Sequence, residues 1–167
     1  MRPIEPTVLG ELYRQHAPAL RLYARQWGGG GEDLVQNAFM RLVQQAPPPE
    51  QVLPWLYRVV RNEGLANQRT AARRRRREQH AGSTESWFAT TENRLDAEEA
   101  TRRLAELPLE QREVIVARLW GGLTFEAIAG LVGCSLPTTH RRYHTGLAQL
   151  RERLNGTWTR TPSTPMT

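Results

Sequence analysis

The stretch from Leu123 to Leu154 constrains the fold more than any other part of the chain, because it holds the start, turn and restart signals of two consecutive helices. Thr124 is suited to cap the first helix, whose apolar residues then recur at helical spacing. Gly133 can adopt the left-handed conformation that ends a helix. Ser135 can cap the next helix, and Pro137 falls in its first turn. Two short helices joined by a tight glycine-containing turn predict a helix-turn-helix.

The second predicted helix carries polar and cationic side chains near its start, where such motifs contact base edges and phosphates. These side chains belong to Thr138, Thr139, His140, Arg141, Arg142 and His144. We expect Thr138, His140 and Arg141 to read base edges, and Arg142 and His144 to reach phosphates. The alternative is an ordinary helical hairpin with a solvated basic face. The order of cap, turn and basic face favours the DNA-binding motif.

The charge balance also favours a polyanionic partner. The 167-residue chain has a formal net charge of +6, and all 23 of its basic residues are arginine, whose planar fork suits phosphate and guanine. Cys134 is the single cysteine, which excludes an internal disulfide and fits a reducing cytoplasm. No apolar run approaches the length of a membrane span, and the N-terminus lacks a signal-peptide core. We therefore expect a cytoplasmic protein without membrane insertion.

Helical spacing and breakers divide the rest of the chain into further helices. These helices are predicted over residues 9–27, 32–46, from about 51 onward, 96–107 and 109–120. Pro18 predicts a kink or a break in the first of them. With 39% hydrophobic residues, two separate cores would each be small.

The sequence therefore predicts an all-α fold of two small helical domains joined by a flexible linker, with the helix-turn-helix in the C-terminal domain. The domains are predicted over residues 1–78 and 95–154. The polar, aperiodic stretch 79–94 is the predicted linker, in which Trp87 and Phe88 stand out as docking candidates. Residues 155–167 are predicted to form a disordered tail.

The third predicted helix has an apolar stripe and, largely off that stripe, an aromatic residue interleaved with arginine and asparagine. The off-stripe residues are Trp55, Arg58, Arg61 and Asn62, with Tyr57 beside them. This combination suits single-stranded nucleic acid, through base stacking and phosphate pairing. The alternative is that Trp55 simply belongs to the core. The helix runs into Arg73–Arg77, a solvated end that could also bind phosphates.

Three segments, in this order, carry a resemblance to a known family. They are EDLVQNAFMRLVQ, PWLYRVVRN and the run from LAELPLEQREVIV to LAQLRERL. Together with the helix before them they cover about residues 9–154, and the chain resembles the extracytoplasmic-function sigma factors, the small two-domain members of the bacterial sigma family. The first segment is similar to the helix that binds the clamp of RNA polymerase, the second to the helix beside the promoter-melting loop, and the third to the whole terminal domain.

The resemblance implies a sigma factor that binds core RNA polymerase and promoter DNA and directs initiation at the minus-ten and minus-thirty-five elements. The implied polymerase-facing residues are Asp33, Gln36, Asn37, Arg41 and Leu42. The implied minus-ten residues are Trp55, Arg58, Arg61 and Asn62. The implied minus-thirty-five residues are Ser135, Thr138, His140, Arg141, Arg142 and His144. Relatives are often held by an anti-sigma factor, although nothing in the sequence identifies one here.

Other classes of function have less support. An ordinary helix-turn-helix regulator that acts without polymerase would need a sensor or dimerisation domain where the first block lies. Cys134, His140 and His144 include a zinc-compatible spacing, yet a structural zinc site needs a fourth ligand and none is near in sequence. No glycine-rich phosphate loop follows a strand and no nucleophile–base pair is suggested, so we expect neither enzymatic chemistry nor a cofactor.

Overall fold

A computed structural model describes residues 4–28, 31–78 and 102–158, and this part of the chain contains helices and no strand. The elements are α1 (Pro6–Ala24), the 3₁₀ turn η1 (Arg25–Trp27), α2 (Gly31–Val43), α3 (Val52–Glu78), α5 (Leu109–Leu119), α6 (Phe125–Val132) and α7 (Leu136–Trp158). Residues 102–105 form a further helical turn before α5. The predicted all-α fold is confirmed.

Helices α1, α2 and α3 pack on one another to form the first module. Each contributes large apolar side chains with no exposed surface, such as Leu20 from α1, Val35 from α2 and Leu56 from α3. An aromatic pair adds to the contact between α1 and α2, where the rings of Tyr13 and Phe39 pack edge to face with centroids 5.0 Å apart. The second module packs α5 and α6 against α7. The two modules correspond to the two predicted helical blocks.

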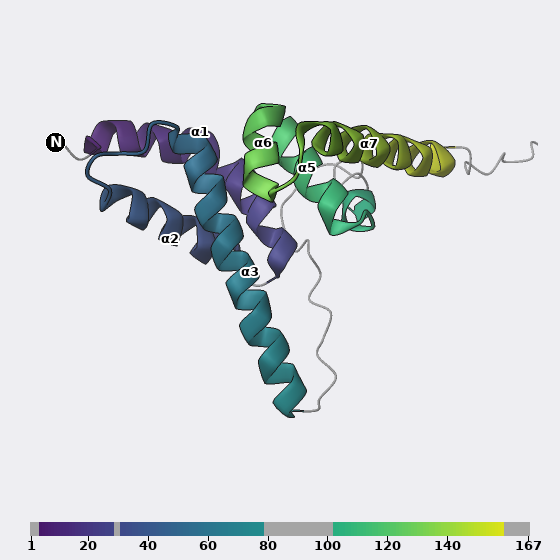
Figure 1. Cartoon of the computed structure of the whole chain (residues 1–167), viewed down its shortest axis with the longest axis horizontal. Coiled ribbons are helices and arrows are strands. Elements are labelled where there is room, and N and C mark those ends of the chain that lie inside the picture. The colour runs from purple at the N-terminus through teal and green to yellow at the C-terminus, as the bar shows by residue number, and fades with distance from the viewer. Residues whose placement is uncertain (1–3, 29–30, 79–101, 159–167) are drawn as a thin grey trace, which may run out of the picture.

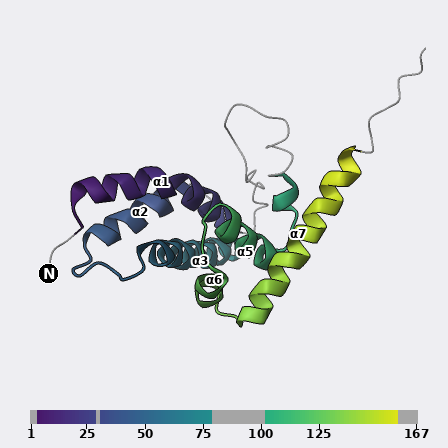
Figure 2. The ribbon, with the colours of Figure 1, turned by 90° about the horizontal axis from the view of Figure 1, so that it is seen from above.

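The two modules are docked on each other. Helix α5 contacts α1 and helix α6 contacts α3, so the buried residues of both modules form one continuous hydrophobic core. Views from two directions place α5 and α6 beside the first module (Figures 1 and 2). The sequence predicted two small separate cores, and the docking joins them into one larger core, which buries more apolar surface than either would alone.

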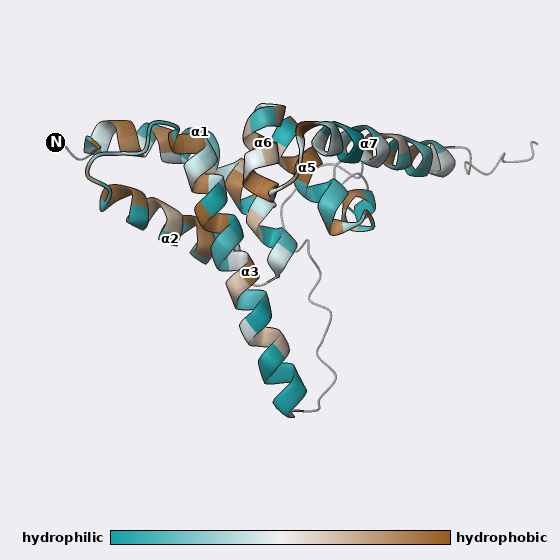
Figure 3. Ribbon diagram, in the orientation of Figure 1, coloured by the Kyte–Doolittle hydropathy of each residue, from teal (hydrophilic) through white to brown (hydrophobic). Residues whose placement is uncertain are grey.

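Two helices extend beyond this joint core. The C-terminal part of α3 projects away from the body, and α7 extends in another direction (Figures 1 and 2). The projecting end of α3 is hydrophilic (Figure 3), and it includes the exposed run Arg73–Arg77. Within the described residues, no helix is both long and apolar enough to cross a membrane.

Several boundaries differ from the prediction. Helix α1 passes through Pro18 without a break, because Ala17 and Leu20 on either side are buried in the core and their packing offsets the lost backbone hydrogen bond. Helix α7 continues to Trp158, so residues 155–158 of the predicted disordered tail are helical; each added residue extends an existing helix by one hydrogen bond. The predicted linker 79–94, with Trp87 and Phe88, and residues 159–167 lie outside the described residues.

Candidate polymerase and nucleic-acid interfaces

The helix-turn-helix has the caps that the sequence predicted. The Thr124 hydroxyl oxygen accepts a hydrogen bond from the backbone N–H of Ala127 at 3.1 Å and so starts α6. Gly133 ends α6 in the left-handed conformation, with φ 72° and ψ 37°, and its N–H donates to the carbonyl of Ala129. The Ser135 hydroxyl accepts from the N–H of Thr138 at 3.3 Å at the start of α7. Local sequence signals therefore define this turn.

One face of α7 is held against α6 and the turn. Thr139 is fully buried, and its hydroxyl donates to the Ser135 carbonyl at 3.0 Å and lies 3.2 Å from the Cys134 sulfur. The His140 ring packs on Phe125 at a centroid distance of 4.1 Å. The Arg118 guanidinium also lies over the Phe125 ring, 4.7 Å from its centroid. These contacts fix the rotation of α7 about its axis.

The predicted DNA-contacting residues of α7 differ in exposure, and Thr139, also predicted among the polar residues at the start of this helix, is buried. Arg141 and His144 are exposed, whereas His140 is half-buried by its contact with Phe125. Arg142 is half-buried and forms an ion pair with Glu110 of α5 at 3.2 Å. The structure thus separates two neighbouring arginines: Arg141 points to solvent, and Arg142 is oriented by a partner within the module.

The spacing that suggested a metal site does not converge in the structure. Cys134 contacts Thr139, and His140 packs on Phe125. Among residues 4–28, 31–78 and 102–158, no group of three or more His, Cys, Asp and Glu side chains is arranged to hold a metal ion. The pair His140 and His144 lies with ring centroids 6.3 Å apart along one side of the helix.

Helix α2 presents a polar face with apolar additions that the sequence analysis missed. Asp33, Gln36, Asn37 and Arg41 are all exposed on it. Met40 and Val43 are exposed as well, at 61% and 43%. Arg41 is oriented by an ion pair with Glu63 of α3 at 2.8 Å. The face combines charge with accessible apolar surface, as protein interfaces do.

Leu42 does not belong to that face. It has no exposed surface and lies in the core of the first module. Its predicted position on the polymerase-facing surface is therefore wrong. The reason is the helical period: Leu42 follows Leu34, Val35 and Ala38 at spacings of three and four, which places it on the buried stripe.

The predicted nucleic-acid residues of α3 differ in exposure. Arg58 and Asn62 are exposed, while Trp55 is half-buried and packs against the hydrophobic core. Tyr57, which the sequence places beside these polar residues, is fully buried. It is covered from the second module, where Gly121 approaches so closely that a Cβ added there would lie 2.5 Å from the Tyr57 hydroxyl oxygen.

Arg61 is turned toward the second module. Its Nε donates to the Glu113 carboxylate of α5 at 2.5 Å, and the Tyr23 hydroxyl of α1 donates to the same oxygen at 2.6 Å. Glu113 is 4% exposed, so this carboxylate is buried with both partners supplied by the first module. Burial, followed by the Glu113 charge, raises the pKa of Tyr23 well above its ordinary value, so the phenol remains a donor.

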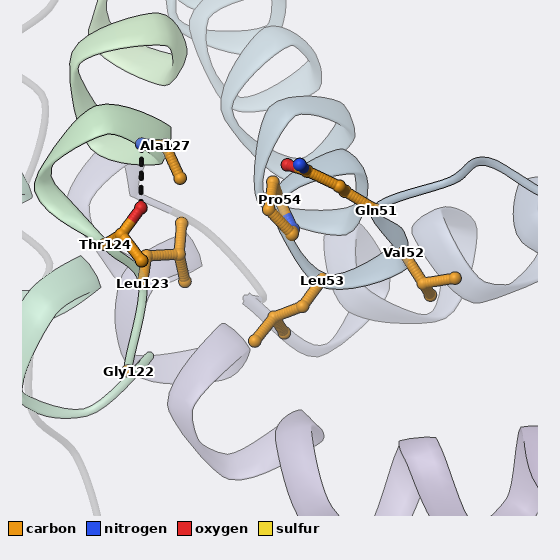
Figure 4. Close-up of a pocket in the computed structure, with 8 residues that line it drawn as sticks. All are labelled: Gln51, Val52, Leu53, Pro54, Gly122, Leu123, Thr124 and Ala127. Atoms are coloured by element: carbon orange, nitrogen blue, oxygen red, sulfur yellow. Dashed lines mark hydrogen bonds between the residues drawn. The ribbon is translucent and has the colours of Figure 1, made fainter.

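A pocket marks the other end of the boundary between the modules. It is lined by residues at the start of α3, among them Leu53 and Pro54, and by residues from Gly122 to Ala127 at the start of α6 (Figure 4). The lining is mostly apolar and the Thr124 cap lies at its wall. The docked second module therefore covers the beginning of α3, next to Trp55.

Protein-family comparisons match both modules. The description "Sigma-70 region 2" matches residues 12–79, and "Sigma-70, region 4" matches residues 97–150. The ECF RNA polymerase sigma factor EcfG of Rhodopseudomonas palustris (strain TIE-1) is 28% identical over 145 residues, which is 80% of this chain and 77% of the relative. The RNA polymerase sigma factor CarQ of Myxococcus xanthus is 28% identical over 157 residues, 86% of this chain and 87% of the relative.

Solved structures give the same result at the level of the fold. The sigma factor RpoE of Bartonella quintana, solved in complex with the anti-sigma factor NepR, has a TM-score of 0.74 and 25% identity, covering 90% of this chain and 98% of that one. CnrH, solved in complex with the cytosolic domain of CnrY, has a TM-score of 0.61 and 23% identity, covering 91% and 90%. The second likeness concerns the fold alone.

Proposed function

Because the chain belongs to the extracytoplasmic-function sigma factors of bacterial RNA polymerase, we propose that three of its surfaces divide the work of initiation. Such a protein binds core polymerase and promoter DNA and directs transcription to chosen promoters. We propose a first functional domain over residues 1–78, a linker over 79–94 and a second domain over 95–154. The family matches at residues 12–79 and 97–150 support these bounds. No observation favours a regulator that acts without polymerase.

The polymerase-binding surface is proposed on α2. It comprises Asp33, Gln36, Asn37 and Arg41, to which the structure adds Met40 and Val43. The polar residues are exposed, and the ion pair of Arg41 with Glu63 holds that side chain in a defined direction. The two exposed apolar side chains supply surface that gains from burial under a protein partner.

The minus-ten surface is proposed on α3 around Arg58 and Asn62, with Trp55 and Arg61 beside them. The exposed pair can contact backbone and base edges of opened DNA directly. Trp55 retains exposed ring surface for stacking although part of it packs on the core. The exposed arginine run 73–77 extends the same helix with positive charge, which suits DNA phosphates.

The minus-thirty-five surface is proposed at the start of α7. Its members are Ser135, Thr138, His140, Arg141, Arg142 and His144. The exposure of Arg141 is the observation that supports base reading. Its guanidinium can reach a guanine without breaking a hydrogen bond or ion pair to another described residue. Ser135 sets the helix start through its cap. Arg142 is better placed for phosphate, since its orientation already depends on Glu110.

Three further properties follow from this role. The chain performs no bond chemistry of its own, and the polymerase it recruits makes RNA. Its place of action is the cytoplasm, where polymerase and promoter DNA are found. We propose an anti-sigma factor as its regulator, by analogy with the complex in which the RpoE relative was solved.

In vitro transcription tests the proposal. Core polymerase and genomic DNA of the source organism should give new promoter-specific transcripts only when this protein is added. Reversal of Asp33 to Arg should weaken co-purification with core polymerase, whereas reversal of the exposed Glu50, outside α2, should not. Equal binding by both variants would exclude the assigned face on α2.

A further inference from the structure

The contact between the modules rests on a carboxylate whose position makes sense only when they are docked. Glu113 lies on α5 of the second module and is 4% exposed, and it accepts from Tyr23 of α1 and Arg61 of α3 in the first. A carboxylate is costly to bury unless it is paired and hydrogen-bonded. With the modules apart, Glu113 and Arg61 would both return to water. The pair therefore specifies the docked arrangement rather than the fold of either module.

Arg61 links this contact to DNA binding. It belongs to the minus-ten surface proposed above, and in the docked state its Nε is already committed to Glu113 at 2.5 Å. Its side chain is 22% exposed there. The second module also covers the start of α3, where the pocket of Figure 4 is lined by residues 51–54 and, from the second module, by residues 122–124 and Ala127. While its Nε is held on the buried Glu113 carboxylate, the Arg61 guanidinium is fixed against the second module and cannot turn freely toward a DNA phosphate, so docking and minus-ten binding compete for this side chain.

The same contact also contains a feature that destabilises the docked arrangement. The Tyr57 hydroxyl is buried beneath Gly121 of the second module and has no hydrogen-bond partner among the described residues. A buried hydroxyl without a partner opposes the arrangement that buries it, and separation of the modules would return it to water. The docked state is thus held by the shared apolar core and by the paired charge of Arg61, and it is opposed by the unpaired hydroxyl of Tyr57, four positions earlier on α3.

We propose that Glu113 is a latch which holds the free protein in a closed, inactive arrangement, and that release of Arg61 from Glu113 precedes engagement of the minus-ten element. The inhibitory consequence rests on the proposed role of α3, whereas the latch itself rests only on the contact between the modules. The occupant that opens it is opened promoter DNA, whose phosphates compete with the Glu113 carboxylate for Arg61. The test must therefore measure closure and function separately.

Closure is measured on the full chain by small-angle X-ray scattering. The wild-type protein should match the compact docked arrangement, and Glu113→Gln should expand it, because the amide loses the charge-assisted bond from Arg61. We expect the ratio of closed to open chains to fall by about 10- to 100-fold. Glu106→Gln is the matched control, since Glu106 pairs at the surface with Arg153 inside the second module and should leave the radius of gyration unchanged.

A second pair of variants moves the equilibrium without changing the charge. Tyr23→Phe removes one of the two donors to Glu113 and should also expand the chain. Tyr57→Phe removes the unpaired hydroxyl and should shift the chain further toward the closed state. Should Glu113→Gln lose helical circular dichroism, Tyr23→Phe carries the test of opening. Opposite shifts by the two tyrosine variants are what a latch predicts, and equal or absent shifts would overturn it.

Function is measured by stopped-flow binding of single-stranded DNA to the full chain and by open-complex formation with core polymerase. Glu113→Gln should associate with the single strand faster than wild type, and Tyr57→Phe more slowly. If Glu113→Gln opens in scattering but associates at the wild-type rate, the latch exists without inhibiting, and the proposal fails. If wild-type protein directs no transcription at all, the proposed function fails, while the scattering still decides whether Glu113 holds the modules together.

Discussion

Gly64 offers the sharpest test of how α3 is seated in the first module. A Cβ added at Gly64 would lie 2.8–2.9 Å from three ring atoms of Trp27. Trp27 is 4% exposed, so its ring has little room to move away. Gly10 is the matched control, because it lies inside α1 and an added Cβ there meets nothing within 4 Å.

The two substitutions should differ in their effect on stability. Alanine in place of a helical glycine stabilises by about 1 kcal/mol, and Gly10→Ala should show this gain in full. Gly64→Ala has the same gain but overpacks the core, which costs about 1–3 kcal/mol. The free energy of unfolding of the two variants should therefore differ by about 1–3 kcal/mol, with Gly64→Ala the less stable.

Urea unfolding followed by far-ultraviolet circular dichroism measures this difference. A Trp27→Leu background provides the internal check, because a smaller side chain relieves the overlap and should reduce the penalty of Gly64→Ala. Gly64→Ala as stabilising as Gly10→Ala would refute the close packing of α3 on η1. A penalty that is unchanged in the Trp27→Leu background would place the strain elsewhere.

Three further predictions concern the recognition helix and the contact between the modules. Thr124→Ala should lower the free energy of unfolding by about 1 kcal/mol in urea titrations, and Thr124→Ser should retain most of the cap. Arg141→Ala should relax base preference at one promoter position by about 1–3 kcal/mol in a variant-promoter binding panel, whereas Arg142→Ala should weaken all promoters alike and lower the salt slope by about one. The raised pKa of Tyr23 keeps it protonated in the folded state while the unfolded chain ionises near its ordinary 10.0, so stability should be full below that pH and fall as pH rises above it. Tyr23→Phe should show a smaller alkaline loss in pH-dependent melting, and an equal loss would place the titrating group elsewhere.

The features that sequence could predict are those with local causes. The turn between α6 and α7 depends on contacts within five positions along the chain, so it can be predicted without knowledge of the rest of the chain. These contacts are made by the caps Thr124 and Ser135 and by the backbone of Gly133. The helical period also predicts burial when it is applied strictly. Leu42 was misplaced because a family role was assigned to it although its spacing already put it on the apolar stripe.

The contact between the modules could not be predicted in this way. Glu113 pairs with Arg61 across 52 positions and with Tyr23 across 90, and neither separation leaves a periodic signal. Glu113 follows three polar residues, Glu110 to Arg112, so nothing local marks it as a buried carboxylate, and only the docked structure supplies its partners. The same contact contributes to the burial of Tyr57, because Gly121 of the second module lies against its hydroxyl group.

A charged residue at this contact has a consequence that an apolar residue would lack. Apolar side chains of similar volume in place of a buried ion pair often leave stability unchanged or raise it, so a pair is not needed merely to hold two surfaces together. What Glu113 adds is competition, because its partner Arg61 is also attracted by any polyanion. The double variant Glu113→Leu with Arg61→Met should therefore stay compact in scattering, while single-stranded DNA that expands the wild-type chain should leave it closed. If the apolar pair opens with DNA as readily as wild type, competition for Arg61 is not the means by which nucleic acid separates the modules.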